Sequence, residues 1–162
     1  MDEILIRLRD IKLILFDLEG VLLFKDDLEN ESRMNRIIFH LNKFCSKAGK
    51  QNIKVAILTA RPDDDLTKNL LDSGVNDVLT SSIDKVALSK KLLAKYDLEY
   101  SAAFYIADDI LDIPLLQKVG VSAAPMSARR EVKRVVDYVT KGSNLEEILD
   151  EIWDLFRISR MY

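Results

Sequence analysis

A short apolar run that ends abruptly in carboxylates constrains the fold of this chain more than any other feature. Residues 11–16 read IKLILF, and they are followed at once by Asp17, Glu19 and Gly20. A continuous apolar run of this length is typical of a strand buried on both faces of a parallel sheet. Open parallel sheets place their ligand sites at the carboxyl ends of such strands. Because a carboxylate buried there is unfavourable without a positive partner, the motif predicts a binding site.

Strand-like and helix-like segments alternate along the rest of the chain. Further apolar runs predict strands at 53–58, 77–79, 103–106, 121–124 and 138–140. Apolar residues at helical spacing predict helices at about 32–48, 62–74, 85–96, 111–118, 127–134 and 144–159. Residues 2–9 fit either a short helix or a lead-in strand. Such alternation predicts an α/β fold with a doubly wound parallel sheet, in a three-layer, Rossmann-like architecture. The first strand is expected to be central, and one domain is expected over residues 1–162.

Several helix ends carry recognisable signals. Ser32 is placed to cap the helix over 32–48, and Gly49 is placed to stop it. Pro62 fits the first turn of the next helix, where the acids at 63–65 favour the positive end of the helix dipole. The segment 22–32, LLFKDDLENES, is expected to be a polar loop after a short apolar start.

Composition excludes several classes of function. The 162 residues carry a net charge of -3, with both signs spread along the chain, which argues against a nucleic-acid surface. The single cysteine, Cys45, rules out an internal disulfide and fits a reducing compartment. No apolar run approaches the ~20 residues of a membrane span, and the acidic N-terminus does not read as a signal peptide. The cytoplasm is therefore the expected location, without nucleic-acid or membrane partners.

Polar residues gather where the predicted strands end. They are Asp17 and Glu19 after the first strand, Thr59 after the second, Lys85 at the helix after the third, and Asp108, Asp109 and Asp112 after the fourth. If the first and fourth strands flank the topological switch, Asp17 and Asp108 face each other across the crevice. Two such carboxylates repel unless one takes up a proton or a cation lies between them. Oxygen ligands of this kind favour Mg²⁺, which also binds phosphate.

The same set of residues suits phosphoryl transfer. The Thr59 hydroxyl, neighbouring backbone amides and the Lys85 ammonium would cradle a phosphoryl group together with the metal. Asp17 would then act as the nucleophile, because a metal-screened carboxylate can approach phosphorus. Glu19 would protonate the leaving oxygen and later activate water.

These motifs resemble those of the haloacid dehalogenase superfamily of aspartyl-phosphate phosphatases. Residues 17–20, DLEG, are similar to the family's Asp-x-Asp-Gly motif, and Thr59 in LTAR is similar to its second motif. Lys85 is similar to the family lysine, and residues 107–112, ADDILD, are similar to Gly-Asp-Asp-x-x-Asp. Four motifs in order, each at a strand end or helix start, make a specific signal.

From about residue 53 to residue 156 the chain is similar to the capless phosphatases of 3-deoxy-octulosonate 8-phosphate and related nonulosonate phosphates. The stretches YIADDILDIPLLQKVGVSAAP and DYVTKGSNLEEILDEI carry that similarity. The resemblance implies a fold without a cap domain and Mg²⁺-dependent hydrolysis of a small phosphorylated metabolite, such as a sugar acid phosphate. It also implies an aspartyl-phosphate intermediate.

The resemblance assigns roles to individual residues. Asp17, the backbone carbonyl of Glu19 and the side chain of Asp108 would hold the metal, Asp112 would orient its waters, and Asp109 would assist. The substrate phosphate is expected against Thr59, Ala60, Arg61 and Lys85. A surface ion pair explains Arg61 equally well.

Three departures from the family pattern keep alternatives open. Glu19 replaces the usual aspartate, as it does in the enolase-phosphatases, and Ala107 replaces a glycine. Residues 22–36 do not match the hairpin that supports tetramer formation in the octulosonate enzymes. The sequence therefore leaves open the homo-oligomeric state and the physiological substrate. It also leaves open a degenerate binding or regulatory module, and a phosphotransferase or phosphomutase that uses the same intermediate.

Overall fold

A six-stranded parallel sheet forms the centre of the molecule in the computed structural model, which describes residues 1–24, 27 and 30–161. The strands run in the order β3-β2-β1-β4-β5-β6, so the first strand is central, as predicted. Their bounds are β1 Leu13–Asp17, β2 Lys54–Leu58, β3 Asp77–Leu79, β4 Ala103–Ile106, β5 Val121–Pro125 and β6 Tyr138–Thr140. Every neighbouring pair is parallel.

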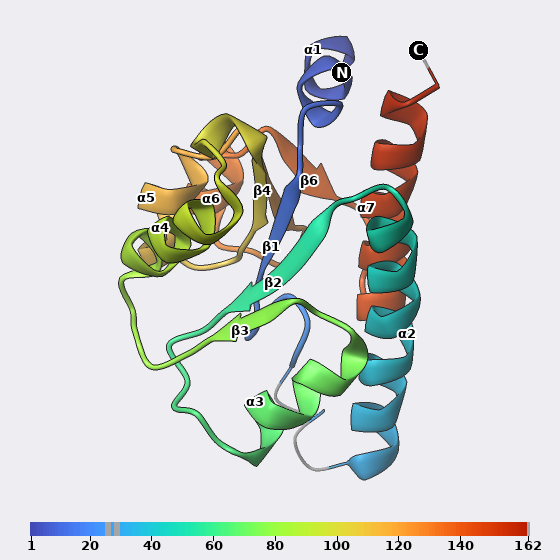
Figure 1. Cartoon of the computed structure of the whole chain (residues 1–162), viewed down its shortest axis with the longest axis vertical. Coiled ribbons are helices and arrows are strands. Elements are labelled where there is room, and N and C mark those ends of the chain that lie inside the picture. The colour runs from blue at the N-terminus through green and yellow to red at the C-terminus, as the bar shows by residue number, and fades with distance from the viewer. Residues whose placement is uncertain (25–26, 28–29, 162) are drawn as a thin grey trace.

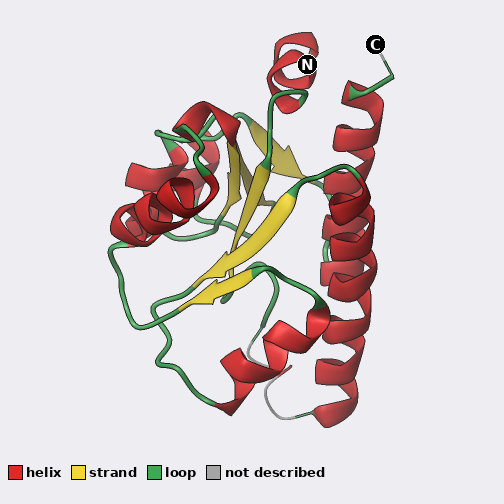
Figure 2. Cartoon of the chain, in the orientation of Figure 1, coloured by secondary structure: helices red, strands yellow, loops and turns green. Residues whose placement is uncertain are grey.

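Helices cover both faces of this sheet (Figures 1 and 2). The helices are α1 Asp2–Leu8, α2 Glu31–Lys50, α3 Asp65–Leu70, α4 Lys85–Tyr96, α5 Ile113–Leu116, α6 Arg130–Val135 and α7 Leu145–Ser159. Short 3-10 turns occupy Leu71–Ser73, Tyr100–Ala102 and Ile110–Asp112. One core joins α1, α2, α3 and α7 to the sheet, and a second joins α4, α5 and α6 to the opposite face. The predicted three-layer α/β fold is confirmed, and of the two alternatives for residues 2–9 the structure has the helix, α1, which ends at Leu8.

The central strand is buried on both faces because its side chains alternate between the two cores. Ile14 and Phe16 pack toward α2 and α7, while Leu13 and Leu15 pack toward α4 and α5. All four are fully buried. This is the environment that the continuous apolar run of residues 11–16 predicted.

Connections between the elements are short, so the fold carries no cap domain. The longest runs from residue 18 to residue 30 between β1 and α2, far below the ~50 residues of a small domain. The loop predicted over 22–32 lies here, and its residues 25, 26, 28 and 29 fall outside the described part of the chain. The expectation of one domain over 1–162 includes those residues and stays a prediction. None of the described helices has the length and apolarity needed to cross a bilayer.

The ends of α2 differ from the prediction. Asn30 caps the helix instead of Ser32, because its Oδ1 accepts hydrogen bonds from the amides of Ser32 at 3.0 Å and Arg33 at 3.3 Å. Gly49 does not stop the helix, which continues to Lys50. The left-handed residue that ends it is Asn52, with φ 58°, since asparagine tolerates this conformation better than most residues.

The helix after β2 also begins later than predicted. Pro62 lies outside α3, and Asp64 caps the helix by accepting from the amide of Thr67 at 3.0 Å, while the Thr67 hydroxyl accepts from the Asp64 amide at 2.9 Å. The capping box therefore sets the start of the helix, and Pro62 does not. The helix predicted over 111–118 divides into a 3-10 turn and the four residues of α5, and the one predicted over 127–134 begins at Arg130.

Candidate active site

The register of the sheet brings the predicted site residues to one edge. Asp17 pairs with Leu58 on one side, and Phe16 pairs with Ile106 on the other. Thr59 and Asp108 therefore follow β2 and β4 directly beside the end of β1. Lys85 begins α4, whose first turn is capped by the Asp84 carboxylate accepting from the Ala87 amide at 3.0 Å.

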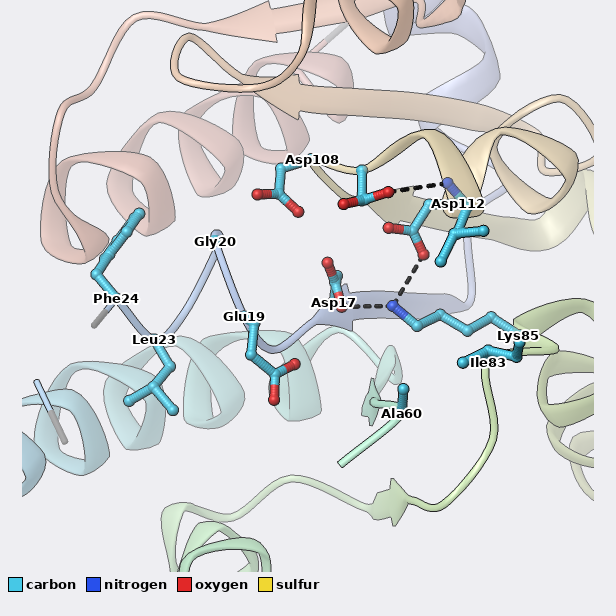
Figure 3. A pocket seen from close by; sticks show the side chains of 12 residues that line it. Asp17, Glu19, Gly20, Leu23, Phe24, Ala60, Ile83, Lys85, Asp108 and Asp112 are labelled. Carbon is cyan, nitrogen blue, oxygen red and sulfur yellow. Dashed lines mark hydrogen bonds and ion pairs between the residues drawn. The ribbon is translucent and has the colours of Figure 1, made fainter. Parts of the chain in front are cut away.

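Three carboxylates and one ammonium group form the centre of this site (Figure 3). Asp17, Asp108 and Asp112 each offer an oxygen, and these oxygens lie within 4.8 Å of one another. The Nζ of Lys85 lies 2.6 Å from Oδ1 of Asp17 and 2.8 Å from Oδ1 of Asp112. The Leu18 amide also donates to Oδ1 of Asp17 at 2.9 Å. Two donors therefore hold the same oxygen of the Asp17 carboxylate in place.

Gly20 allows Asp108 to reach this cluster. Its φ of +82° lies in the left-handed region, and a Cβ at this position would lie 1.8 Å from Oδ2 of Asp108. Only a residue without a side chain fits both the backbone conformation and the close approach. The glycine that follows Glu19 is thus a packing requirement of the carboxylate cluster.

Burial and mutual repulsion shift the ionisation of these groups. Burial raises the pKa of Asp17 well above its usual value; Lys85 opposes the shift, and the Asp112 and Asp108 carboxylates add to it. Burial, with Asp112 and Asp109, also raises the pKa of Asp108, against the opposing effect of its hydrogen bond with Asp17. Burial alone would lower the pKa of Lys85, but Asp17 and Asp112 outweigh it and raise that pKa. The cluster holds more negative charge than Lys85 alone balances.

Tyr105 is a member of this network that the sequence reasoning missed. Its hydroxyl donates to Oδ1 of Asp112 at 2.8 Å from a fully buried position on β4. Burial raises the pKa of Tyr105 well above its usual value, and the Asp17 and Asp112 carboxylates add to the shift. A tyrosine inside an otherwise apolar strand was the available signal, because a buried hydroxyl needs a partner.

Glu19 and Thr59 contact each other instead of the carboxylate cluster. The Thr59 hydroxyl donates to the Glu19 carboxylate, with Oε2 at 3.0 Å, and accepts from the Arg61 amide at 3.0 Å. Figure 3 shows the Glu19 side chain directed away from Asp17 and Asp108. The acid/base role of Glu19 and the phosphate-binding role of Thr59 stay predictions.

The remaining predicted residues lie at the margin of the site. Ala60 lines the cavity described below, whereas Thr59 and Arg61 are not among its described lining residues. The Nε of Arg61 lies 2.8 Å from the Asp64 carboxylate, so the ion pair considered for this arginine is formed. Asp109 lines the cavity, but its Oδ1 accepts from the Leu111 amide at 3.1 Å and its side chain is not in the carboxylate cluster.

A cavity of about 470 Å³ opens above the cluster. Apolar residues that the sequence reasoning did not single out form much of its wall: Leu23, Phe24, Ile83 and Leu111. They come from the loops after β1, β3 and β4. No spacing rule marks them in the sequence, because only the folded loops bring them together.

The donor set fits a hard divalent cation. The donors are carboxylate oxygens alone, and Oδ2 of Asp112 is buried without a hydrogen-bond partner among the described residues. A buried carboxylate oxygen without a partner is unfavourable unless something positive completes it. Oxygen-only sets of this kind match the preference of Mg²⁺.

Comparisons with known proteins identify the proteins to which this chain is similar. Residues 24–152 match the sequence model of the family described as haloacid dehalogenase-like hydrolase. The chain is 23% identical over 162 residues to the 3-deoxy-D-manno-octulosonate 8-phosphate phosphatase KdsC of Escherichia coli K12, with 98% of this chain and 85% of that protein covered.

Two solved structures share the fold. The cobalt-bound deoxy-D-mannose-octulosonate 8-phosphate phosphatase of Haemophilus influenzae superposes with a TM-score of 0.80 at 21% identity, covering 96% of this chain and 92% of that one. The 3-deoxy-D-manno-octulosonate 8-phosphate phosphatase of Moraxella catarrhalis, in complex with magnesium, phosphate and KDO, has a TM-score of 0.77 at 20% identity, covering 98% and 92%. The similarity expected from the motifs therefore extends over nearly the whole chain.

Proposed function

This chain belongs to the haloacid dehalogenase-like hydrolases, and from that premise we propose that it is a phosphatase that hydrolyses phosphomonoesters with the help of Mg²⁺. The observation that carries the proposal is the convergence of Asp17, Asp108 and Asp112 within 4.8 Å, with Lys85 bridging the first and the last. One of the two solved relatives is cobalt-bound and the other is in complex with magnesium, which supports a divalent ion in the same place.

Each residue has a role in the proposed reaction. One oxygen of the Asp17 carboxylate attacks phosphorus, and Lys85 and the Leu18 amide, which both donate to Oδ1, hold the carboxylate in orientation. The P–O bond to the leaving group breaks as the Asp17–phosphorus bond forms, and Glu19 gives its proton to the leaving oxygen. Water then attacks the aspartyl-phosphate, Glu19 takes its proton, and phosphate leaves with the Asp17 carboxylate restored.

Asp17, Asp108 and Asp112 would hold the metal. When bound, a divalent ion supplies positive charge that screens the phosphoryl oxygens from the attacking carboxylate. Lys85 holds Asp17 in orientation and adds a second positive charge, while Tyr105 and Lys85 together fix Asp112. We assign Thr59, Ala60 and Arg61 to the loop that borders the phosphate, and of these three Ala60 is a described lining residue of the cavity.

The substrate is proposed to be a small phosphate ester. The relatives named above carry the name of an octulosonate 8-phosphate phosphatase, and a phosphorylated sugar acid is therefore one candidate substrate. Distant relatives share the type of reaction more often than the substrate, because the contacts with the substrate come from variable loops.

One observation favours a second candidate, a binding or regulatory module with little catalysis. The Glu19 carboxylate is hydrogen-bonded to Thr59, and the acid/base role requires it to face the leaving group instead. Mg²⁺-dependent release of phosphate separates the two candidates.

The decisive experiment is phosphate release from p-nitrophenyl phosphate by the wild-type protein and by Asp17→Asn. Hydrolysis is expected to disappear on chelation with EDTA, to return with Mg²⁺, and to be absent from Asp17→Asn. A phospho-enzyme trapped in the wild type should be labile to hydroxylamine, as acyl phosphates are.

Asp72→Asn is the matched control, because Asp72 is exposed in the 3-10 turn after α3 and lies outside the site. It removes one carboxylate with the same change of atoms and should keep wild-type turnover. Full activity in Asp17→Asn would refute the assignment of the nucleophile, and no phosphate release from the wild type would favour the binding module.

A further inference from the structure

Two exposed apolar side chains lie at the mouth of the candidate active site, and the buried Leu23 and the half-buried Phe24 form more of its apolar wall. Ile83 is 68% exposed and Leu111 is 64% exposed, and both line the same cavity as Asp17 and Lys85. Leu23 and Phe24 continue the wall on the side of the loop after β1 (Figure 3). We call these four residues the apolar rim. Isolated exposed apolar residues are common, but a group of them around a polar centre marks a binding surface.

The cavity has room for more than a phosphoryl group. Its volume of about 470 Å³ lies within the ~300–1,000 Å³ range of pockets that enclose a small organic ligand. A phosphoryl group held against Asp17 and Lys85 would occupy the polar floor of the cavity. The leaving group must then lie higher in the cavity, against the apolar rim.

The charge of the described lining disfavours a second anionic group on the substrate. It contains five carboxylates, and its one cationic side chain, Lys85, is already paired with Asp17 and Asp112. A divalent ion and Lys85 together leave this lining negative. A carboxylate on the leaving group would meet repulsion from Asp109 and Glu19 without a described partner in the wall.

We infer that the leaving group of the substrate is uncharged and presents an apolar face to Ile83 and Leu111. This inference rests on the proposed phosphatase function and narrows its substrate class to monoesters of alkyl, alicyclic or aromatic alcohols. It therefore excludes the phosphorylated sugar acid that was one candidate substrate of that function. Since burial of one methylene favours binding about fourfold, contact with two exposed aliphatic side chains is sufficient to set specificity.

Three substrates with similar leaving oxygens test the inference. Cyclohexylmethyl phosphate and glucose 6-phosphate are both primary esters next to a six-membered ring, and they differ in ring polarity. The third substrate, 6-phosphogluconate, adds a carboxylate. With Mg²⁺ present, kcat/KM is expected to be at least about tenfold higher for cyclohexylmethyl phosphate than for glucose 6-phosphate, and lowest for 6-phosphogluconate.

Variants of the apolar rim provide the second arm. Leu111→Ser and Ile83→Ser should each reduce the ratio of kcat/KM between cyclohexylmethyl phosphate and glucose 6-phosphate by about tenfold. Both side chains are exposed, so the fold should tolerate the changes. Ile6→Ser is the matched control, because Ile6 is 58% exposed on α1, at the opposite end of the sheet (Figure 1), and the ratio should stay as in the wild type.

Failure of this inference and failure of the proposed function give different results. Phosphate release that depends on Asp17 but is fastest with 6-phosphogluconate would overturn the inference and leave the phosphatase intact. If no ester is hydrolysed, calorimetric binding of cyclohexylmethylphosphonate against methylphosphonate still tests the rim, and equal affinities would overturn the inference. A change of oligomeric state in Leu111→Ser, with an unchanged substrate ratio, would assign the rim to contact with another protein chain and would also overturn it.

Discussion

Replacing Gly20 by alanine should disable the site through a single methyl group. The new Cβ would lie 1.8 Å from Oδ2 of Asp108 and 2.4 Å from its Cγ. Ordinary van der Waals contact begins at 3.4 Å, so the Asp108 carboxylate has to move by 1.6 Å or the loop has to shift. Misplacement of a catalytic group by ~1 Å can reduce the rate about 100-fold. We therefore expect kcat/KM to fall by at least about 100-fold.

Stability and metal affinity should fall together with activity. An alanine at the φ of +82° is strained by about 1–2 kcal/mol before any steric effect. Displacement of Asp108 also removes one of the three proposed metal ligands. Mg²⁺ is expected to raise the Tm of the wild type, because a ligand that binds the native state stabilises it. That rise should be reduced or absent in Gly20→Ala.

Gly49→Ala is the matched control for this substitution. Gly49 lies inside α2, and a Cβ there would have nothing within 4 Å. The change should stabilise the protein by about 0.5–1 kcal/mol and leave hydrolysis and the Mg²⁺ response as they are. If Gly20→Ala keeps the activity and the Mg²⁺ affinity of the wild type, the prediction is wrong. Neither property would then depend on the close approach of Asp108 to residue 20.

Three further predictions concern other parts of the network. Tyr105→Phe removes the donor to the buried Asp112 carboxylate and should lower the free energy of unfolding, measured in urea, by about 1.5–3 kcal/mol. An unfolding curve of the variant that matches that of the wild type would contradict this prediction. Burial alone would raise the pKa of Asp137, but its bonds with Arg7 and Ser122 outweigh burial and hold that pKa below the usual value. Asp137→Asn should therefore lower the free energy of unfolding at pH 7. The difference in unfolding free energy between this variant and the wild type should shrink as the pH falls below ~4. A difference that does not change with pH would show that the ionised Asp137 carboxylate does not stabilise the fold. Burial raises the pKa of Cys45 to about 12, so iodoacetamide at pH 8 should label the unfolded chain and spare the native one.

Local patterns in the sequence predicted the elements well where one physical cause dominated. The apolar run at 11–16 could only be satisfied between two layers of helices, and β1 is buried in that way. Helix ends were harder because several residues compete for one cap. Asn30 and Asp64 supply side-chain acceptors that fit the first turn of α2 and of α3. Ser32 is therefore not the cap of α2, and Pro62 is not in the first turn of α3.

For the candidate site, the sequence predicted which residues lie at the sheet edge but not how their side chains contact one another. Asp17, Thr59, Lys85 and Asp108 follow strand ends or begin a helix, so the parallel topology alone places them at one edge. Contacts between side chains were not accessible to that reasoning. Lys85 pairs with Asp112 as well as Asp17, Tyr105 supports Asp112 from the strand interior, and Glu19 turns to Thr59.

The sequence by itself determined the α/β class and the identity of the acids at the sheet edge, because hydrophobic periodicity and motif order are local properties of the chain. Only the tertiary structure decided which oxygens of those acids converge, why residue 20 must be glycine, and which apolar side chains stand around the cavity. Those features depend on distances between loops after β1, β3 and β4, which are far apart in sequence and are set by the packing of the whole sheet.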